Sequence, residues 1–264
     1  MKILVTFALE TEFAPWRVRH KFRRDSWGAV EAYLTEIGGA EVAVVLTGVG
    51  SRQAALAMSR ISWGEPGTVQ FWISSGLAGA LKPEYRIGQV LASRSVVAEV
   101  APAGASSRVL ESSPALISFV AESGATVVDR FYTAERAVTT SHEKRHLGGS
   151  ADAVEMESFQ VLLKARADGL PAVAIRSISD AVDEDLPLDM NQVFTARGEV
   201  SIPRVLGQVA MKPQSLPGLV RLGRNSKQAA ESLADFLDRY ILAFSERTSA
   251  LESRAVAAPV RVPH

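Results

Sequence analysis

The chain has 264 residues, of which 47% are hydrophobic and 22% charged, the balance of an ordinary soluble globular protein. Lys and Arg (29) offset Asp and Glu (29), so the formal net charge is zero and no global basic field would attract nucleic acid or an anionic membrane. Cys is absent, which excludes disulfides and thiolate chemistry. With no secretory signal and no apolar run of membrane-spanning length, we expect a cytoplasmic protein.

Apolar runs that end in turn residues predict the first strands. Residues 3–9 are mostly apolar, as in a strand buried on both faces, and the run ends in acids that include Glu12. Residues 41–46 predict a second strand, which closes in Thr-Gly-Val-Gly. Ser51 is then the expected N-cap of a helix over residues 53–61.

Shorter elements are expected in the middle of the chain. Residues 70–74 predict a strand that ends in the glycine-rich segment SSGLAGAL, and residues 88–97 could extend the sheet. Residues 101–115, rich in Ala, Ser, Gly and Pro, are expected to form a surface loop. A helix over 116–122 and short strands over 33–37, 125–129 and 136–139 complete this part.

Residues 153–180 combine a strand, a helix and a second strand. An extended run ends at Glu155, and apolar residues then recur at the spacing of one helix face. Residues 172–175 predict a buried strand that leads to Asp180. Because ligands of open α/β sheets bind at the carboxyl ends of the strands, we expect Glu157 and Asp180 to face one crevice.

The C-terminal part predicts a loop over residues 183–189 and an amphipathic helix with apolar residues from 233 to 244. Strands alternate with helices and no internal repeat is present, which predicts one α/β domain over residues 1–245. Residues 246–264 are expected to form a flexible tail.

The carboxylates at these strand ends are the strongest chemical signal. In a shared pocket, burial and repulsion could push the pKa values of Glu12 and Asp180 apart, so that one activates water and the other donates a proton. Glu157, in the first turn of a helix, would be held ionised by the positive helix end and could bind two sugar hydroxyls. From spacing alone the structural alternative is favoured, in which the acids cap a helix and Asp180 is a turn residue.

Two weaker patterns leave alternatives open. Gly48-Val49-Gly50 lacks the third glycine of a dinucleotide fingerprint, so it is either a structural turn or a ligand-facing loop. His142 and His146 have helical spacing that could hold a metal. Without a Glu at the metalloprotease position and without a third ligand, an exposed helix face is favoured.

Five segments, in order, resemble the purine nucleoside phosphorylase/uridine phosphorylase superfamily: MKILVTFALETEF, LTGVGSRQAA, SSGLAGALKPEYRIGQV, AVEMES and RSISDAVDEDLP. They span residues 1 to about 195 and are most similar to the 5′-methylthioadenosine/S-adenosylhomocysteine nucleosidases. The resemblance implies a three-layer α/β/α sandwich with a central mixed sheet. It also implies a homodimer that splits the N-glycosidic bond of a purine nucleoside without a metal or organic cofactor.

The resemblance implies a role for each matching residue. Asp180 matches the acid that protonates the purine at N7, and Glu12 matches the carboxylate that activates the attacking water. Glu157 matches the acceptor of the ribose hydroxyls, and Met156 the side chain packed on the sugar. Arg176 and Ser179 match residues that position the Asp180 loop, and the other implied substrate contacts are Ala8, Val49, Gly76, Leu77, Ala78 and Glu155.

Departures from the family pattern separate the possible functions. Leu77 stands where the nucleosidases usually carry Ser, which suits a more apolar pocket. Residues 70–74 lack the Arg of the family's phosphorylases, which argues against phosphorolysis. Arg52 could bind an anion, although a solvated arginine is favoured.

The leading hypothesis is therefore a nucleosidase that releases adenine from a 5′-substituted adenosine. A phosphorylase using phosphate, or a nucleoside-binding protein without turnover, is the alternative. Residues 200–240 and SSGLAGALKP are more similar to a branch associated with hopanoid biosynthesis, which is thought to act on an adenosyl-lipid.

Overall fold

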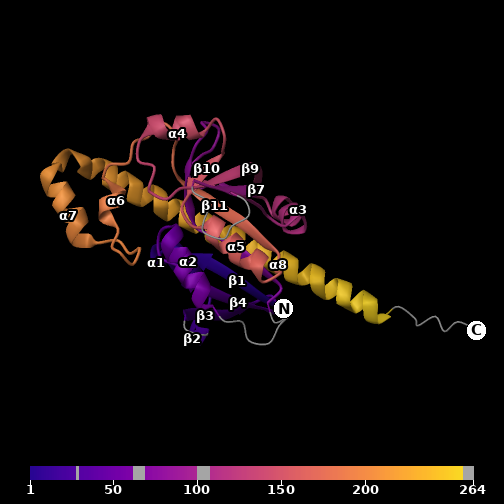
Figure 1. The fold of residues 1–264 in the computed structure, drawn as a ribbon. Coiled ribbons are helices and arrows are strands. Elements are labelled where there is room, and N and C mark those ends of the chain that lie inside the picture. Colours follow the sequence, from indigo (N-terminus) through magenta and orange to yellow (C-terminus); the bar gives the residue numbers. More distant parts are fainter. Residues whose placement is uncertain (28–29, 62–68, 100–107, 258–264) are drawn as a thin grey trace, which may run out of the picture.

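The computed structural model describes residues 1–27, 30–61, 69–99 and 108–257. Within them, eleven strands form one mixed sheet in the order β2-β3-β4-β1-β5-β11-β6-β10-β9-β7-β8 (Figure 1). The strands are β1 (Lys2–Phe7), β2 (Arg23–Trp27), β3 (Val30–Ile37), β4 (Ala40–Leu46), β5 (Phe71–Ser74), β6 (Leu77–Ala80), β7 (Val90–Ala98), β8 (Val109–Glu111), β9 (Thr126–Thr133), β10 (Ala153–Glu155) and β11 (Ala172–Asp180). The helices are α1 (Glu10–Arg17), α2 (Ser51–Arg60), α3 (Pro114–Glu122), α4 (Ser141–Leu147), α5 (Ser158–Ala167), α6 (Met190–Val193), α7 (Ile202–Met211), the 3-10 turn η1 (Pro213–Ser215) and α8 (Leu216–Ala257).

Helices cover both faces of the sheet, because its inner strands are apolar on both sides. In β1, Ile3 and Val5 pack into a core with α1, α3 and α8, whereas Leu4 between them packs into a second core with α2 and α5. This alternation follows from the two-residue period of a strand. The fold is thus a single-domain α/β/α sandwich around a mixed sheet, as expected from the sequence.

Strand β11 is the centre of the sheet, and all nine of its residues are buried. It pairs in parallel with β5 and β6 and antiparallel with β7. Strands β4, β1, β5 and β11 run parallel, so their carboxyl ends lie along one edge. That edge carries the candidate site.

Several local predictions were wrong. Ser51 is the first residue of α2 rather than its N-cap, and its hydroxyl donates to the Met156 carbonyl (3.3 Å). Residues 136–139 form no strand, since β9 already ends at Thr133 and Val138 packs beside Leu81 in a small apolar cluster instead.

The loop expected over residues 101–115 falls mostly on residues 100–107, which lie outside the described residues. Its second half is ordered secondary structure, because β8 pairs with β7 and Pro114 begins α3. Proline is well suited to a first helical position, where the missing N–H group has no partner to lose.

Helix α8 has 42 residues and is about 63 Å long at 1.5 Å per residue. Its apolar face is buried as predicted, and the buried residues are Leu233, Phe236, Leu237, Tyr240 and Ile241. The helix continues to Ala257, so residues 246–257 are helical where the sequence predicted a flexible tail, and residues 258–264 lie outside the described residues. Among the described helices, none combines the length and hydropathy needed to cross a bilayer.

Candidate functional site

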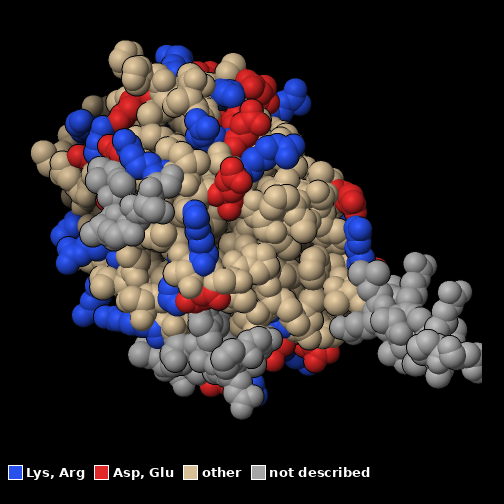
Figure 2. All heavy atoms as spheres, turned by 45° about the vertical axis from the view of Figure 1, so that its right-hand side comes forward, with Lys and Arg blue, Asp and Glu red and all other residues tan. Residues whose placement is uncertain are grey.

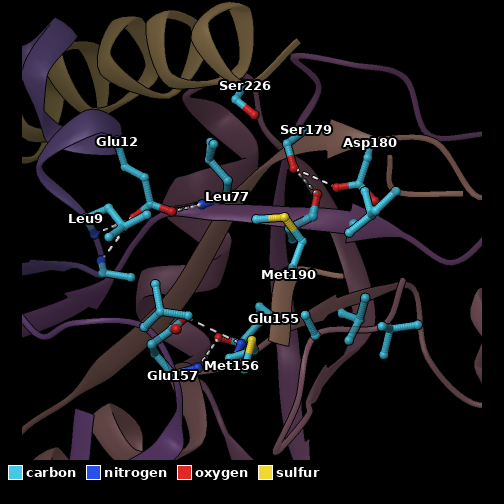
Figure 3. Close-up of a pocket in the computed structure, with 18 of the residues that line it drawn as sticks. Leu9, Glu12, Leu77, Glu155, Met156, Glu157, Ser179, Asp180, Met190 and Ser226 are labelled. Atoms are coloured by element: carbon cyan, nitrogen blue, oxygen red, sulfur yellow. Dashed lines mark hydrogen bonds between the residues drawn. The ribbon is translucent and has the colours of Figure 1, made fainter. Parts of the chain in front are cut away.

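A cavity of about 210 Å³ opens at the carboxyl ends of β1, β10 and β11. Ten of the twelve residues predicted for the site line it: Ala8, Glu12, Val49, Leu77, Ala78, Glu155, Met156, Glu157, Ser179 and Asp180. Figure 3 shows Glu12 and Leu77 on one side, Ser179 and Asp180 on the other, and Glu157 with Met156 below. Gly76 and Arg176 do not line the cavity but lie behind its wall.

Glu12 both caps α1 and faces the cavity. Its Oε2 accepts hydrogen bonds from the backbone N–H groups of Ala8 (3.0 Å) and Leu9 (3.2 Å), and its Oε1 accepts from Leu77 N–H (3.4 Å). A Cβ added at Gly76 would lie 3.2 Å from Oε2, so the absence of a side chain at Gly76 leaves room for the carboxylate. Burial raises the pKa of Glu12 above its ordinary value, although Arg176 and these three N–H groups lower it.

Asp180 is aimed into the cavity by an irregularity at the end of β11. The register with β6 shifts between Ile178 and Asp180, and such a bulge redirects the side chains that follow it. Gly79 lies opposite, where a Cβ would be only 2.8 Å from Asp180 Oδ2. Ser179 donates a hydrogen bond from its hydroxyl to Asp180 Oδ1 (2.8 Å), so Ser179 does position this carboxylate.

Lys144 is the main residue of the site that the sequence did not reveal. It is fully buried, and its ammonium group donates to Asp180 Oδ2 (2.5 Å) and to the carbonyls of Ala181 and Glu184 (2.9 Å each). All three donors of the ammonium are therefore used. Its position within SHEKRH, a polar and charged run, carried no signal of burial.

Arg176 holds Glu155 in place behind the part of the cavity that Glu157 lines. It was expected to position the Asp180 loop, but its Nη2 donates to Glu155 Oε2 (2.6 Å) and its Nη1 donates to the Ser74 carbonyl (2.8 Å). Glu155 Oε2 also accepts from the N–H groups of Glu157 (3.0 Å) and Ser158 (2.7 Å). This buried network fixes the turn that leads into α5.

Glu157 departs from the prediction that a helix end would hold it ionised. It is the N-cap of α5, and its Oε1 accepts from Gly50 N–H (2.8 Å). Burial, and then the neighbouring charge of Glu155, raise the pKa of Glu157 to about 8 against the opposing effect of Arg176. Desolvation therefore raises the pKa of Glu157 by more than the positive end of the helix lowers it.

The Gly48-Val49-Gly50 segment is both a structural turn and a ligand-facing loop, the two alternatives that the sequence left open. The N–H group of Gly50 donates to Glu157, and Val49 lines the cavity.

Replacement of Glu157 by Gln is expected to stabilise the protein increasingly as pH rises. A carboxyl whose folded-state pKa is raised favours folding at pH values below its unfolded pKa of about 4.5, and this contribution is lost as pH rises through about 8. Urea unfolding at about pH 5 and about pH 8 should show the difference between Glu157→Gln and wild type growing by on the order of a few kcal/mol, at about 1.36 kcal/mol per unit of pKa. Glu36→Gln, at an exposed glutamate, is the control. Equal stability of Glu157→Gln and wild type at both pH values would contradict the burial argument.

The ionisable side chains that line the cavity are predominantly acidic. Among the described residues, Arg136 is the one cationic side chain in its lining, and it is engaged by Glu143 through two hydrogen bonds. Arg52 is exposed and lies at a different depression, beside Thr47 and Arg60. The described residues contain no cluster of metal ligands, and His142 and His146 are exposed.

Solved structures share this fold over nearly the whole chain. The futalosine hydrolase of Helicobacter pylori strain 26695 is 19% identical, with 91% of this chain and 97% of that chain covered and a TM-score of 0.69. The 5′-methylthioadenosine/S-adenosylhomocysteine nucleosidase of Helicobacter pylori, bound to butyl-thio-DADMe-Immucillin-A, has the same identity and coverage and a TM-score of 0.70. The nucleosidase of Neisseria meningitidis, in complex with methylthio-immucillin-A, is 21% identical, with 92% and 99% covered and a TM-score of 0.68. At these identities the likeness establishes the fold.

The family follows from the sequence match. The motifs quoted above resemble one superfamily in their order along the chain, and the fold agrees with it. A family model described as the phosphorylase superfamily matches residues 2–209 of the 264 residues. This chain belongs to the phosphorylase superfamily.

Proposed function

We propose that the chain is a nucleosidase that hydrolyses the N-glycosidic bond of a 5′-substituted adenosine and releases adenine. The observation that carries the proposal is the placement of Glu12 and Asp180 on opposite sides of one cavity, with Glu157 and Met156 below them (Figure 3). The arrangement offers a carboxyl group to the leaving base, a second to the attacking water and a third to the sugar.

In the proposed reaction, Asp180 passes to purine N7 a proton that it takes from the Lys144 ammonium, which is left as the neutral amine. The N9–C1′ bond breaks at the same time and its electron pair moves into the base. Positive charge then develops at C1′ and the ring oxygen of the sugar, where nearby carboxylates are stabilising. Glu157 accepts hydrogen bonds from the ribose hydroxyls. A water molecule adds to C1′ and passes its proton to Glu12, whose raised pKa makes it a better base than an exposed glutamate.

Water is favoured over phosphate as the nucleophile because the cavity is lined by carboxyl groups and offers no free cation among its described lining residues. Four carboxyl groups line it, from Glu12, Glu155, Glu157 and Asp180, and Arg136 is already paired with Glu143. A phosphate dianion entering there would find no unengaged arginine among the described lining residues to balance its charge. Strand β5 also lacks the arginine found in the family's phosphorylases.

An apolar 5′ substituent is favoured by a groove beside the cavity. Leu77 and Ser226 line both the cavity and a groove of about 630 Å³ that runs between α1 and α8 past Ala14, Pro15 and Val18. Substrates from 5′-methylthioadenosine to an adenosyl-lipid therefore fit the proposal. Bound methylthio-immucillin-A and butyl-thio-DADMe-Immucillin-A in the similar nucleosidases support a 5′-thioether nucleoside as the first substrate to test.

The substrate test compares kcat/KM for adenine release from 5′-methylthioadenosine and from 5′-alkylthioadenosines of increasing chain length. We expect kcat/KM to rise with chain length in wild type, because each buried CH₂ group contributes about 0.8 kcal/mol. The rise should be smaller in Leu77→Ser. An efficiency that falls steadily with chain length in both proteins would contradict the assignment of the groove to the 5′ substituent.

Lys144→Met is expected to lower turnover by on the order of 100-fold. The Lys144 ammonium orients Asp180 and, in the proposed reaction, replaces the proton that Asp180 gives to N7. The variant should also be less stable, because it removes one partner of a buried ion pair, and the double variant Lys144→Met/Asp180→Asn should recover stability but not activity. The matched control is Lys164→Met at the more exposed Lys164–Asp168 pair. Wild-type turnover and an unchanged pH profile in Lys144→Met would show that Lys144 has no part in the reaction.

The proposal also includes a homodimer that acts in the cytoplasm without a metal or organic cofactor, as the family resemblance implies. Light scattering on the purified protein tests the dimer. Activity that survives prolonged treatment with a chelator tests the independence from metal.

A further inference from the structure

Residues 202–227 form a strongly basic segment in a protein with no net charge. No Asp or Glu lies between Glu199 and Glu231, and the segment carries five cationic residues: Arg204, Lys212, Arg221, Arg224 and Lys227. All five are exposed. On the face of the molecule shown in Figure 2, by contrast, acidic and basic side chains both occur.

The same segment exposes large apolar side chains. Ile202 and Leu206, one turn apart on α7, are each 62% exposed, and Met211 at the end of that helix is 84% exposed. Leu216 and Val220, one turn apart on α8, are 50% and 55% exposed. None of the ten residues of α7 is buried. Exposed apolar residues concentrated in this way mark an interaction surface.

This segment, which comprises α7, η1 and the first three turns of α8, is called the docking hairpin below. In Figure 1 α7 stands apart from the sheet at one end of the molecule, and α8 returns from it toward the sheet. Leu222 and Ser226, at the end of the hairpin, line the cavity. Whatever the hairpin binds is therefore held close to the candidate site.

We propose that the docking hairpin binds the surface of an anionic lipid bilayer. Short helices with apolar side chains flanked by Lys and Arg lie in the interface of a membrane, with the apolar groups at the acyl boundary and the cations on the headgroups. Lys212 and Arg224 form no ion pair with any described residue, so their charge is available for headgroups. Arg221 and Lys227 pair with Glu184 (3.4 Å) and Glu231 (3.9 Å), and Arg204 donates to the Phe194 carbonyl (2.6 Å).

The charge of the hairpin argues against a second copy of this chain as its occupant. A twofold interface places the same surface of each subunit against its counterpart, so two uncompensated basic segments would meet. An anionic bilayer instead satisfies both the cations and the apolar side chains.

Membrane binding by the docking hairpin does not depend on the proposed reaction, but it would place the candidate site at the membrane surface. A substrate whose apolar 5′ substituent is anchored in the bilayer would reach the groove from the membrane side, since Gly223 and Lys227 of the hairpin line that groove. The protein would work as a peripheral membrane enzyme without crossing the bilayer.

Co-sedimentation of the purified full-length protein with large unilamellar vesicles tests the proposal. We expect binding to an equal mixture of phosphatidylcholine and phosphatidylglycerol, weaker binding at high salt and little binding to phosphatidylcholine alone. Lys212→Gln/Arg224→Gln should weaken partition into the mixed vesicles roughly 30-fold. Leu206→Ser/Met211→Ser should weaken it about as strongly.

Matched controls lie elsewhere on the surface. Leu56→Ser replaces an apolar residue that is 42% exposed on α2, and Arg60→Gln/Arg94→Gln removes two exposed charges. These variants should bind vesicles like wild type, and circular dichroism should show every variant folded. Failure of the wild type to bind the mixed vesicles, equal binding to neutral vesicles, or a change of oligomeric state in the hairpin variants without lipid would overturn the proposal. None of these measurements depends on adenine release, so the membrane proposal can fail or succeed separately from the proposed function.

Discussion

Asp180→Asn is expected to lower kcat for adenine release by roughly 1,000-fold while nucleoside binding changes by only a few-fold. Asparagine has nearly the shape of aspartate, and its carbonyl oxygen can still accept from Ser179 or Lys144. Its amide can donate a hydrogen bond to N7 but cannot transfer a proton. The leaving purine would depart as an anion, which raises the barrier for breaking the N9–C1′ bond.

Steady-state kinetics with 5′-methylthioadenosine, and calorimetric titration of the inactive variant with the same nucleoside, would separate turnover from binding. Asp183→Asn, at the exposed aspartate three residues further on, is the control and should keep full activity. Full activity in Asp180→Asn would exclude Asp180 as the proton donor. A loss of binding as large as the loss of turnover would instead assign Asp180 to ground-state recognition.

Glu12→Gln is expected to lower kcat/KM by roughly 100- to 1,000-fold and to change the pH profile. Glu12 must be ionised to accept a proton from water, so wild-type activity should fall as pH drops through its pKa. Burial raises that pKa, and the acid limb should therefore lie above the value of about 4.5 of an ordinary glutamate. The residual activity of Glu12→Gln should lack this limb.

The same variant should be at least as stable as wild type near neutral pH. An acid with a raised folded-state pKa loses folding stability as pH rises above its unfolded-state pKa of about 4.5, and the neutral amide does not suffer this loss. Glu10→Gln is the neighbouring control, because Glu10 pairs with Arg17 (3.0 Å) at the surface instead of lining the cavity. Wild-type activity in Glu12→Gln, or an acid limb shared by both enzymes, would show that another group activates the water.

The positions of the acids could be predicted from the sequence because each follows an apolar strand. Strands β1 and β11 run parallel, so Glu12 and Asp180 were expected at the same edge of the sheet once these strands were recognised. Glu157 follows β10, which runs antiparallel to β11, so strand direction alone does not explain why it reaches the same cavity. The structural alternative proved compatible with this convergence. Glu12 does cap α1, and its carboxylate faces the cavity at the same time.

The partners of these acids could not be predicted in the same way. Lys144 lies on a short polar helix, and it reaches Asp180 across 36 positions of the chain, a pairing that leaves no periodic signal. Arg176 lies in a strand whose residues are all buried, and only the three-dimensional structure shows that its guanidinium meets Glu155 rather than Asp180. For Glu157, the helix end and burial act in opposite directions, and only the buried neighbours decide which prevails.

The docking hairpin shows what the composition of a whole chain cannot predict. A net charge of zero predicts no overall attraction to an anionic membrane, yet Arg204 to Lys227 is a stretch without any acid. Averaging over 264 residues hides this asymmetry, and the surface exposure of its apolar residues emerges only from the fold.

The most direct test of the nucleosidase proposal is the reaction of 5′-methylthioadenosine with the purified enzyme in phosphate-free buffer, with the base and the sugar identified by mass spectrometry. Hydrolysis predicts adenine and free 5-methylthioribose in equal amounts, at a rate that added phosphate does not increase. Adenine formed only with phosphate, together with the sugar 1-phosphate, would identify a phosphorylase. Binding of the nucleoside without release of base, with or without phosphate, would contradict catalysis altogether.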